Sequence, residues 1–157
     1  MCCFGQQKVL PLMNSKALDE TAVQFPKPGS KKPLLVSVGF TQTSSTDSEK
    51  WNKQCASKYW ADARVEYYEL VDLQAAPSFV RGMILRSMRK SIKPAEAPHF
   101  VPFFAGDAEW KKVVGYSEPE VVYYSLADTQ GRVLWQERGP VSEAKCAAME
   151  TAIAKAQ

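Results

Sequence analysis

The sequence predicts an α/β domain in which a central four-stranded mixed sheet has helices on both faces and an extended arm precedes it. Two observations support this class. Short β-branched and aromatic runs alternate with segments of helical periodicity, as in α/β domains. The 157 residues are 45% apolar, so the chain can build one hydrophobic core without metals or disulfides. We expect the arm to span residues 1–33 and the folded domain to span residues 34–157.

The predicted N-terminal arm is rich in residues that interrupt helices. It contains Pro11, Pro26, Pro28, Gly29 and Pro33 among scattered apolar side chains. Proline fixes its own backbone angle and lacks an amide proton. We therefore expect this segment to be extended or irregular rather than a packed helix.

The first part of the domain has the pattern of a β-α-β unit. The run 34–40 is short, apolar and preceded by proline, as expected for a buried central strand. Thr46 and Glu49 have the spacing of a capping box, which predicts a helix over 47–60. The segment 64–71 is rich in aromatic and β-branched residues and predicts a second strand, which the helical crossover makes parallel to the first.

The rest of the chain predicts three helices and a hairpin. They are a helix over 78–93 that ends at Pro94, a short helix or turn over 107–114, a hairpin of strands 121–127 and 132–136, and a helix from Ser142 to about residue 156. The proline-rich stretch after Pro94 is expected to be irregular. This order of elements is that of a thioredoxin-like domain, in which two parallel strands come first and a hairpin comes last.

A redox enzyme of that fold needs a thiolate at the turn between the first strand and the next helix, where helix amides lower the thiol pKa. Here the turn 41–47 reads Thr-Gln-Thr-Ser-Ser-Thr-Asp and contains no cysteine. Hydroxyl groups cannot exchange disulfides, and the turn has no histidine or lysine to activate Ser44 or Ser45. We therefore predict no catalytic residues. Pro119, just before the strand 121–127, is a candidate cis-proline.

The cysteines and the single histidine predict neither a metal site nor a cofactor. The four cysteines are Cys2, Cys3, Cys55 and Cys146, and no two of them form a Cys-x-x-Cys pair. His99 is the only histidine. Cys55 and Cys146 lie within helical patterns, where we expect them to be small buried hydrophobic residues. Cys2 and Cys3 are expected at an exposed, free end of the chain.

The most informative feature is a basic amphipathic helix. The net charge of +3 is too small to indicate a nucleic-acid-binding protein, but residues 81–93 contain no acidic side chain. The candidate partner-binding residues are the basic side chains of this segment, Arg81, Arg86, Arg89, Lys90 and Lys93. All but Arg81 cluster on one helix face, opposite an apolar face centred on Val80, Met83, Ile84 and Met88. Such a face would suit an acidic protein surface or a layer of phospholipid headgroups.

No apolar run approaches the roughly 18 residues of a transmembrane helix. The first 25 residues also lack a secretory hydrophobic region and contain no arginine. We expect a soluble or peripheral protein without a transmembrane segment or a visible presequence.

Several blocks of the chain, in order, resemble one protein family. They are the strand 34–40 with its cysteine-free turn, the helix that carries Trp51, the strand 65–70, the basic helix that closes at Pro94, Trp110 with Gly115-Tyr116, and the block 122–128 followed by Gly131-Arg132-Val133-Leu134-Trp135. Residues 32–155 thereby resemble the mitochondrial ATP synthase assembly factor ten family, whose members are thioredoxin-like and lack the redox motif. The resemblance implies a non-catalytic protein, peripheral to the matrix side of the mitochondrial inner membrane, that assists assembly of the ATP synthase.

These observations leave two functional hypotheses. The first is a non-catalytic interaction protein of a mitochondrial energy-transducing complex, either an ATP synthase assembly factor or a stably bound accessory subunit of the ATP synthase or of a respiratory complex. Its partners would be protein subunits of that complex, with anionic phospholipid as a further contact. The second is a thiol-dependent oxidoreductase of the peroxiredoxin or thioredoxin superfamily that uses Cys55 or an N-terminal cysteine.

Overall fold

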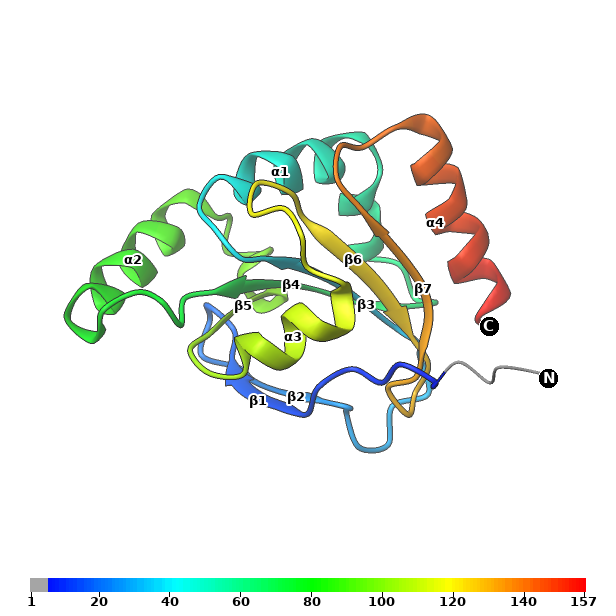
Figure 1. Ribbon diagram of the computed structural model, residues 1–157, viewed down its shortest axis with the longest axis horizontal. Helices are drawn as coiled ribbons and strands as arrows, with labels where there is room; N and C mark the ends of the chain where they lie inside the picture. The colour runs from blue at the N-terminus through cyan, green and yellow to red at the C-terminus, as the bar shows by residue number, and fades with distance from the viewer. Residues whose placement is uncertain (1–5) are drawn as a thin grey trace.

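The computed structural model describes residues 6–157 and shows helices arranged around a central sheet (Figure 1). Its strands are β1 (Met13–Lys16), β2 (Ala22–Phe25), β3 (Leu34–Gly39), β4 (Glu66–Asp72), β5 (Phe100–Phe103), β6 (Tyr123–Ala127) and β7 (Val133–Arg138). Its α-helices are α1 (Ser44–Gln54), α2 (Ser78–Ser91), α3 (Asp107–Val114) and α4 (Glu143–Lys155), and its short 3-10 helices are η1 (Ala56–Trp60) and η2 (Ala97–His99).

The main sheet of the described chain has five strands, in the order β5-β4-β3-β6-β7. β3, β4 and β5 are parallel, whereas β6 and β7 run antiparallel to their neighbours. The predicted parallel pair and the hairpin are confirmed, but the sheet has one strand more than predicted. The additional strand is β5, which contains Pro102 in a stretch expected to be irregular. Because β5 is an edge strand, one side of its backbone needs no sheet hydrogen bond and a proline is tolerated.

Apolar side chains of the central strand β3 point alternately to the two faces of the sheet. Leu35 packs with Trp51 of α1 and Ile153 of α4. Val36 packs on the opposite face in a cluster that includes Trp110 of α3. Figure 1 shows α1 and α4 on one side of the sheet, with α3 and the β1–β2 hairpin on the other. The prediction of helices on both faces is therefore confirmed.

The N-terminal segment, residues 6–33, contributes to this core. Its β1–β2 hairpin buries Met13 and Phe25 in the cluster beneath α3, together with Leu10. The amide of Leu10 donates to the carbonyl of Gly131, in the turn between β6 and β7, over 2.8 Å. The extended lead-in thus covers part of one face of the sheet.

The helix after β3 begins at Ser44 rather than at the predicted residue 47. Thr43 is its N-cap, and the hydroxyl of Ser44 donates to the carbonyl of Thr41 over 2.6 Å. Asp47 has another role, because its carboxylate accepts from the amide of Val122, just before β6, over 2.9 Å. The continuous helix predicted to residue 60 is divided into α1 and the separate 3-10 helix η1.

A disulfide joins Cys55, at the end of α1, to Cys146 in the first turn of α4. The prediction that these cysteines are independent buried hydrophobic residues is therefore wrong. They are separated by 91 residues in sequence, yet their Cα atoms lie 6.0 Å apart because both helices cover the same face of the sheet. The bond ties the C-terminal helix to the body of the domain.

Removing this bond should lower the free energy of unfolding, because it releases a long loop in the unfolded chain. For a loop of this length the chain-entropy effect is about 4–5 kcal/mol. We expect Cys55→Ser combined with Cys146→Ser to lower the urea midpoint, and dithiothreitol to bring the wild type to a similar midpoint. Dithiothreitol should leave the double variant unchanged. Equal midpoints for both proteins without reductant would contradict the prediction.

Candidate functional site

The turn between β3 and α1 is the position at which a redox enzyme of this topology carries its thiolate. Its hydroxyl groups bind the chain's own backbone. The Thr41 hydroxyl donates to the carbonyl of Pro119 over 2.6 Å and accepts from the amide of Ser44 over 3.3 Å. The Ser45 hydroxyl donates to the carbonyl of Gln42 over 2.6 Å. These hydroxyls are therefore occupied by backbone hydrogen bonds at the start of α1.

The turn also lacks room and lacks a base. A Cβ atom at Gly39, which precedes the turn, would lie only 2.6 Å from the Ser44 hydroxyl oxygen. His99 has a different contact, since its Nδ1 atom lies 2.9 Å from the carbonyl oxygen of Tyr67. Within residues 6–157, neither Ser44 nor Ser45 is hydrogen-bonded to a group that could take its proton. The turn therefore assembles no activated nucleophile.

Pro119, the candidate cis-proline, has a trans peptide bond, so that prediction is wrong. In the described part of the chain the cis bond is Phe25–Pro26, directly after β2. Pro119 lies in an exposed turn before β6, and its carbonyl accepts from the Thr41 hydroxyl.

The Cys55–Cys146 disulfide lies at the opposite end of α1 from this turn. α1 has 11 residues and is about 16 Å long at a rise of about 1.5 Å per residue. The disulfide is therefore distant from the N-terminal amides of α1, although Cys146 lies in the first turn of α4. Both cysteines are half-buried. Cys2 and Cys3, expected at a free end, lie outside the described residues.

A buried polar cluster lies between α1 and the sheet. The Glu69 carboxylate accepts from the hydroxyl of Ser48 over 2.7 Å and from the side-chain amide of Asn52 over 2.8 Å. The Tyr67 hydroxyl donates to the side-chain oxygen of Asn52 over 3.0 Å and lies 3.0 Å from the Tyr124 hydroxyl. The second carboxylate oxygen of Glu69 has no hydrogen-bond partner among the described residues. The cluster is thus incompletely satisfied.

Burial raises the pKa of Glu69 to about 7, although its two hydrogen bonds act in the opposite direction. The charges of Glu96 and Glu49 raise it further. Burial also raises the pKa of Tyr67 and of Tyr124 above the usual tyrosine value, so both phenols stay neutral at physiological pH. Sequence reasoning did not identify this cluster as a candidate site. Glu69 is only 3% exposed.

The raised pKa of Glu69 makes folding stability depend on pH. Between about pH 4.5 and pH 7 the unfolded chain loses the Glu69 proton while the folded chain keeps it, so the free energy of unfolding falls as pH rises. We expect Glu69→Gln to remove this decrease in the free energy of unfolding. In the wild type the decrease amounts to about 3 kcal/mol at a pH where Glu69 is ionised in both the folded and the unfolded chain. Urea unfolding at pH 4 and pH 8 measures the difference. The exposed control Glu120→Gln should retain the wild-type dependence, and an unchanged dependence in Glu69→Gln would contradict the prediction.

α2 ends at Ser91 rather than at the predicted residue 93, so it carries four of the five candidate partner-binding residues, and Lys93 follows just beyond it. None of the side chains of α2 is buried. Figure 1 shows this helix at one end of the molecule, beyond the β5 edge of the sheet. Arg81 donates to two carbonyls of the preceding loop, over 2.9 and 3.2 Å. Arg89 donates to the carbonyl of Leu18 over 3.0 Å and forms an ion pair with Glu20. Two of the five basic residues therefore hold α2 against the domain.

Arg86, Lys90 and Lys93 are exposed. The same side of the helix also presents Phe79, which is 88% exposed, and Met83, which is 58% exposed. The prediction that Met83 belongs to the opposite, apolar face is therefore wrong. At about 100° per residue the helical positions 79, 83, 86 and 90 fall within about 60° of the helix circumference, and Lys93 follows the end of the helix. This angular spacing could have identified Phe79 and Met83 from the sequence as members of the exposed side of α2.

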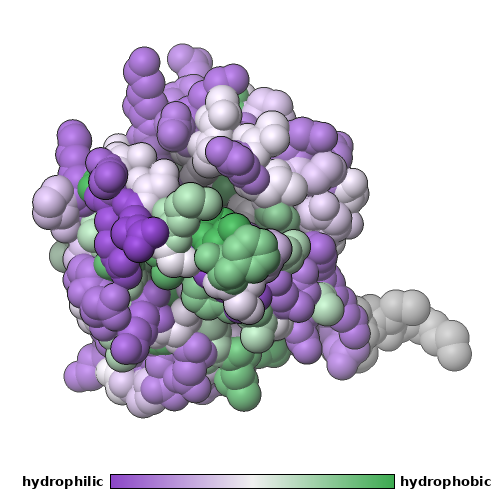
Figure 2. Space-filling model, turned by 90° about the vertical axis from the view of Figure 1, so that its left-hand side faces the viewer, coloured by the Kyte–Doolittle hydropathy of each residue, from purple (hydrophilic) through white to green (hydrophobic). Residues whose placement is uncertain are grey.

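The predicted apolar face of α2, without Met83, is half-buried. Val80, Ile84 and Met88 are partly shielded, and the ring of Phe104 lies 4.9 Å from the guanidinium of Arg81. Figure 2 looks onto this end of the molecule and shows apolar surface bordered by strongly hydrophilic surface. No helix within residues 6–157 is both long and apolar enough to cross a membrane.

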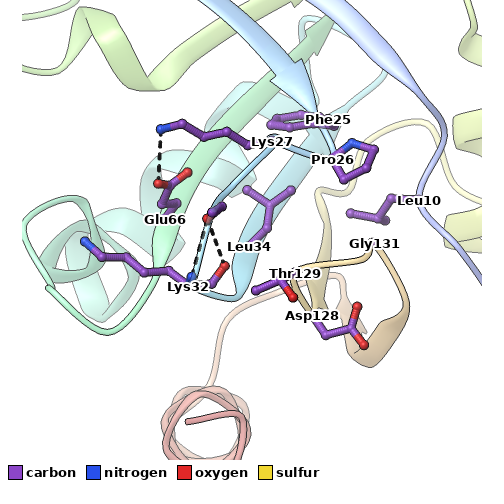
Figure 3. Close-up of a pocket in the computed structure, with 11 residues that line it drawn as sticks. Leu10, Phe25, Pro26, Lys27, Lys32, Leu34, Glu66, Asp128, Thr129 and Gly131 are labelled. Atoms are coloured by element: carbon purple, nitrogen blue, oxygen red, sulfur yellow. Dashed lines mark hydrogen bonds and ion pairs between the residues drawn. The ribbon is translucent and has the colours of Figure 1, made fainter.

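Two hollows of very different size lie within residues 6–157. One cavity of about 20 Å³ lies beside the Lys27–Glu66 ion pair, whose atoms are 3.2 Å apart (Figure 3), and it has space for little more than a water molecule. A more open groove of about 960 Å³ lies between the N-terminal segment and α3, with Leu12 and Trp110 in its lining. No group of three or more His, Cys, Asp or Glu side chains that could hold a metal occurs in the described residues.

Comparisons with known proteins identify the fold. Searches of protein-family models and of curated proteins find no match to this chain. Solved structures do match. An uncharacterized conserved protein from Geobacillus kaustophilus has a TM-score of 0.65 at 14% identity, over 97% of this chain and 84% of its own. A thiol:disulfide interchange protein of the thioredoxin family from Chlorobium tepidum has a TM-score of 0.58 at 13% identity, over 95% and 98% of the two chains.

A thiol-disulfide oxidoreductase from Bacteroides fragilis also matches, with a TM-score of 0.55 at 14% identity, over 92% of this chain and 98% of its own. These likenesses show that the chain has a thioredoxin-like fold, as the order of its elements predicted. At such low identities the likeness extends to the fold alone. What the chain does has to be argued from its own residues.

Proposed function

We propose that this chain is a non-catalytic thioredoxin-like protein that binds protein subunits of a mitochondrial inner-membrane energy-transducing complex. The turn between β3 and α1 is the observation that carries this proposal. Oxidoreductases of this fold need a thiolate there, whereas here Thr41 and Ser44 donate their hydroxyls to backbone carbonyls of the chain itself. The fold is retained, and the chemistry at its usual reactive position is replaced by internal hydrogen bonds.

The partner-binding surface in this proposal is the exposed side of α2. Arg86 and Lys90 are exposed there, Lys93 is exposed just beyond the end of the helix, and α2 contains no acidic residue that would neutralise them. A concentrated positive patch speeds encounter with an acidic partner and opposes association with basic ones. Exposed Phe79 and Met83 add apolar area to the same surface.

The mitochondrial part of the proposal rests on the resemblance to the assembly factor ten family. The most specific block of that resemblance includes the turn between β6 and β7, where the Asp128 carboxylate accepts from the amides of Gln130 and Arg132 over 2.9 Å each. Trp135 of β7 packs against the cluster beneath α4. We propose a position peripheral to the inner membrane on its matrix side, as an ATP synthase assembly factor or as an accessory subunit of the ATP synthase or a respiratory complex.

Reversing the charge of the exposed basic residues should abolish association with the complex. We expect wild-type protein in gently solubilised mitochondria to migrate on a native gel with a large complex or with its partial assemblies, located by mass spectrometry. The variant combining Arg86→Glu, Lys90→Glu and Lys93→Glu should migrate as a free monomer, because it would repel an acidic partner.

The matched control combines Lys50→Glu, Lys53→Glu and Lys112→Glu, which reverses three exposed charges on other helices. This control should migrate like the wild type. Circular dichroism should be the same for all three proteins, since exposed substitutions seldom destabilise a fold. A wild-type protein that runs only as a monomer, or an unaffected charge-reversed variant, would refute the assignment.

A second candidate function is that of a thiol-dependent oxidoreductase. Two observations favour it: solved structures named as thiol-disulfide oxidoreductases share the fold, and Cys55 and Cys146 are bonded to each other. In this case the pair would exchange its disulfide with a dithiol substrate, one thiolate forming a mixed disulfide before the second releases the oxidised product.

The proposal of a non-catalytic protein predicts that this exchange is slow. The rate at which the protein accelerates reduction of a protein disulfide by dithiothreitol should equal that of the Cys55→Ser and Cys146→Ser double variant. Alkylation of reduced Cys55 should follow a titration with an ordinary cysteine pKa of about 8.5. A wild-type rate well above that of the double variant, with a thiol that is ionised at neutral pH, would favour the oxidoreductase.

A further inference from the structure

The exposed side of α2 has a regular geometry that indicates what kind of partner it contacts. Its exposed residues are Phe79, Met83, Arg86 and Lys90, and exposed Lys93 follows just beyond the end of the helix. We call this row the α2 ridge. Its four helical members are four, three and four residues apart, which is the spacing of the contact positions in a helix that packs along another helix. The helical part of the ridge, from residue 79 to residue 90, is about 16 Å long at about 1.5 Å per residue.

The α2 ridge is divided along the helix axis. Its first half is apolar, through Phe79 and Met83, and its second half is basic, through Arg86, Lys90 and Lys93. A helix that lies in a lipid interface has its apolar and basic residues on opposite faces, so that it can insert one face along its whole length. In the α2 ridge the apolar and the basic residues share one face and follow one another along the helix axis. A second helix matches this arrangement better than a lipid surface does.

The other basic residues of α2 fix the direction in which the ridge points. Arg89 binds the Leu18 carbonyl and Glu20, and Arg81 binds two backbone carbonyls and the ring of Phe104. These contacts turn Val80, Ile84 and Met88 toward the domain and leave the ridge outward. Such a fixed orientation reduces the conformational freedom that is lost on binding.

We infer that the α2 ridge docks onto an amphipathic acidic helix of the partner, which presents apolar side chains to Phe79 and Met83 and carboxylates to Arg86, Lys90 and Lys93. This inference rests on the proposed function and specifies the chemistry of its partner. Charge complementarity at the basic half would set the register, and burial of Phe79 at the apolar half would supply affinity.

Synthetic helical peptides test the inference with purified full-length protein. The probe peptides carry leucine at two consecutive contact positions and glutamate at the next three, in both chain directions. The control peptide has the same composition, permuted so that no face combines the leucines and glutamates. Fluorescence anisotropy should show that one faced peptide binds about tenfold or more tightly than the permuted one, with an affinity that falls as salt is added.

Variants of the protein separate the two halves of the ridge. Phe79→Ser with Met83→Ser should weaken binding of the faced peptide by about tenfold, whereas Leu12→Ser, which alters an 84% exposed side chain elsewhere, should not. The variant with Arg86→Glu, Lys90→Glu and Lys93→Glu should no longer bind the faced peptide that carries glutamate. It should bind a peptide in which lysine replaces each glutamate. Equal affinity for faced and permuted peptides, or no effect of Phe79→Ser with Met83→Ser, would overturn the inference.

Vesicles of equal parts phosphatidylcholine and phosphatidylglycerol test the lipid alternative. If the wild type sediments with these vesicles and shows no preference among the peptides, the ridge binds a membrane surface and the inference of a partner helix is overturned. The peptide and native-gel experiments fail independently. If peptides are not distinguished while the charge-reversed variant still leaves the mitochondrial complex, the proposed function stands and this inference falls. If the protein distinguishes the peptides but the wild type migrates as a free monomer in mitochondria, the inference stands and the proposed function falls.

Discussion

The rest of the structure depends on shielding both faces of the central strand β3. Its residues 34–38 are buried, so apolar cover is required on each side of the sheet. α1 and α4 supply one layer. The opposite layer contains α3, which has only eight residues, and the hairpin β1–β2 completes it. Because this face is filled, α2 lies beyond the sheet edge, where none of its side chains is buried. The exposure of the candidate binding helix thus follows from the packing of the core.

Most of the fold could be predicted because its strands and helices carry local signals. The apolar run at β3, the Ser142 cap of α4, which accepts from the Lys145 amide, and the hairpin turn each depend on neighbouring residues. β5 could not be predicted in this way, because Pro102 masks a strand that only the edge of the sheet tolerates. The Cys55–Cys146 bond depends on two helices meeting on one face, over 91 residues of sequence. Long-range pairings of this kind have no local signature.

The candidate site likewise has some features that the sequence predicts and others that it does not. The missing thiol at the turn before α1 is readable directly from the sequence, and so is the basic character of α2. The roles of individual arginines are not, because the partners of Arg89 are Leu18 and Glu20, far along the chain. The buried carboxyl of Glu69 also escapes local reasoning, since an acidic residue in a strand ordinarily faces solvent. It is buried here because Ser48 and Asn52 of α1 reach across to bind it.

The disulfide between α1 and α4 gives the protein two covalent forms. Where the surroundings are oxidising the C-terminal helix is linked to the domain, and where they are reducing the same helix is held by packing and polar contacts alone, among them the hydrogen bond between Tyr59 and Glu150. The bond also joins residues from the middle and the end of the chain, so it can close only after the last helix has been synthesised and has docked. The lifetime of the folded protein therefore depends on the compartment that receives it.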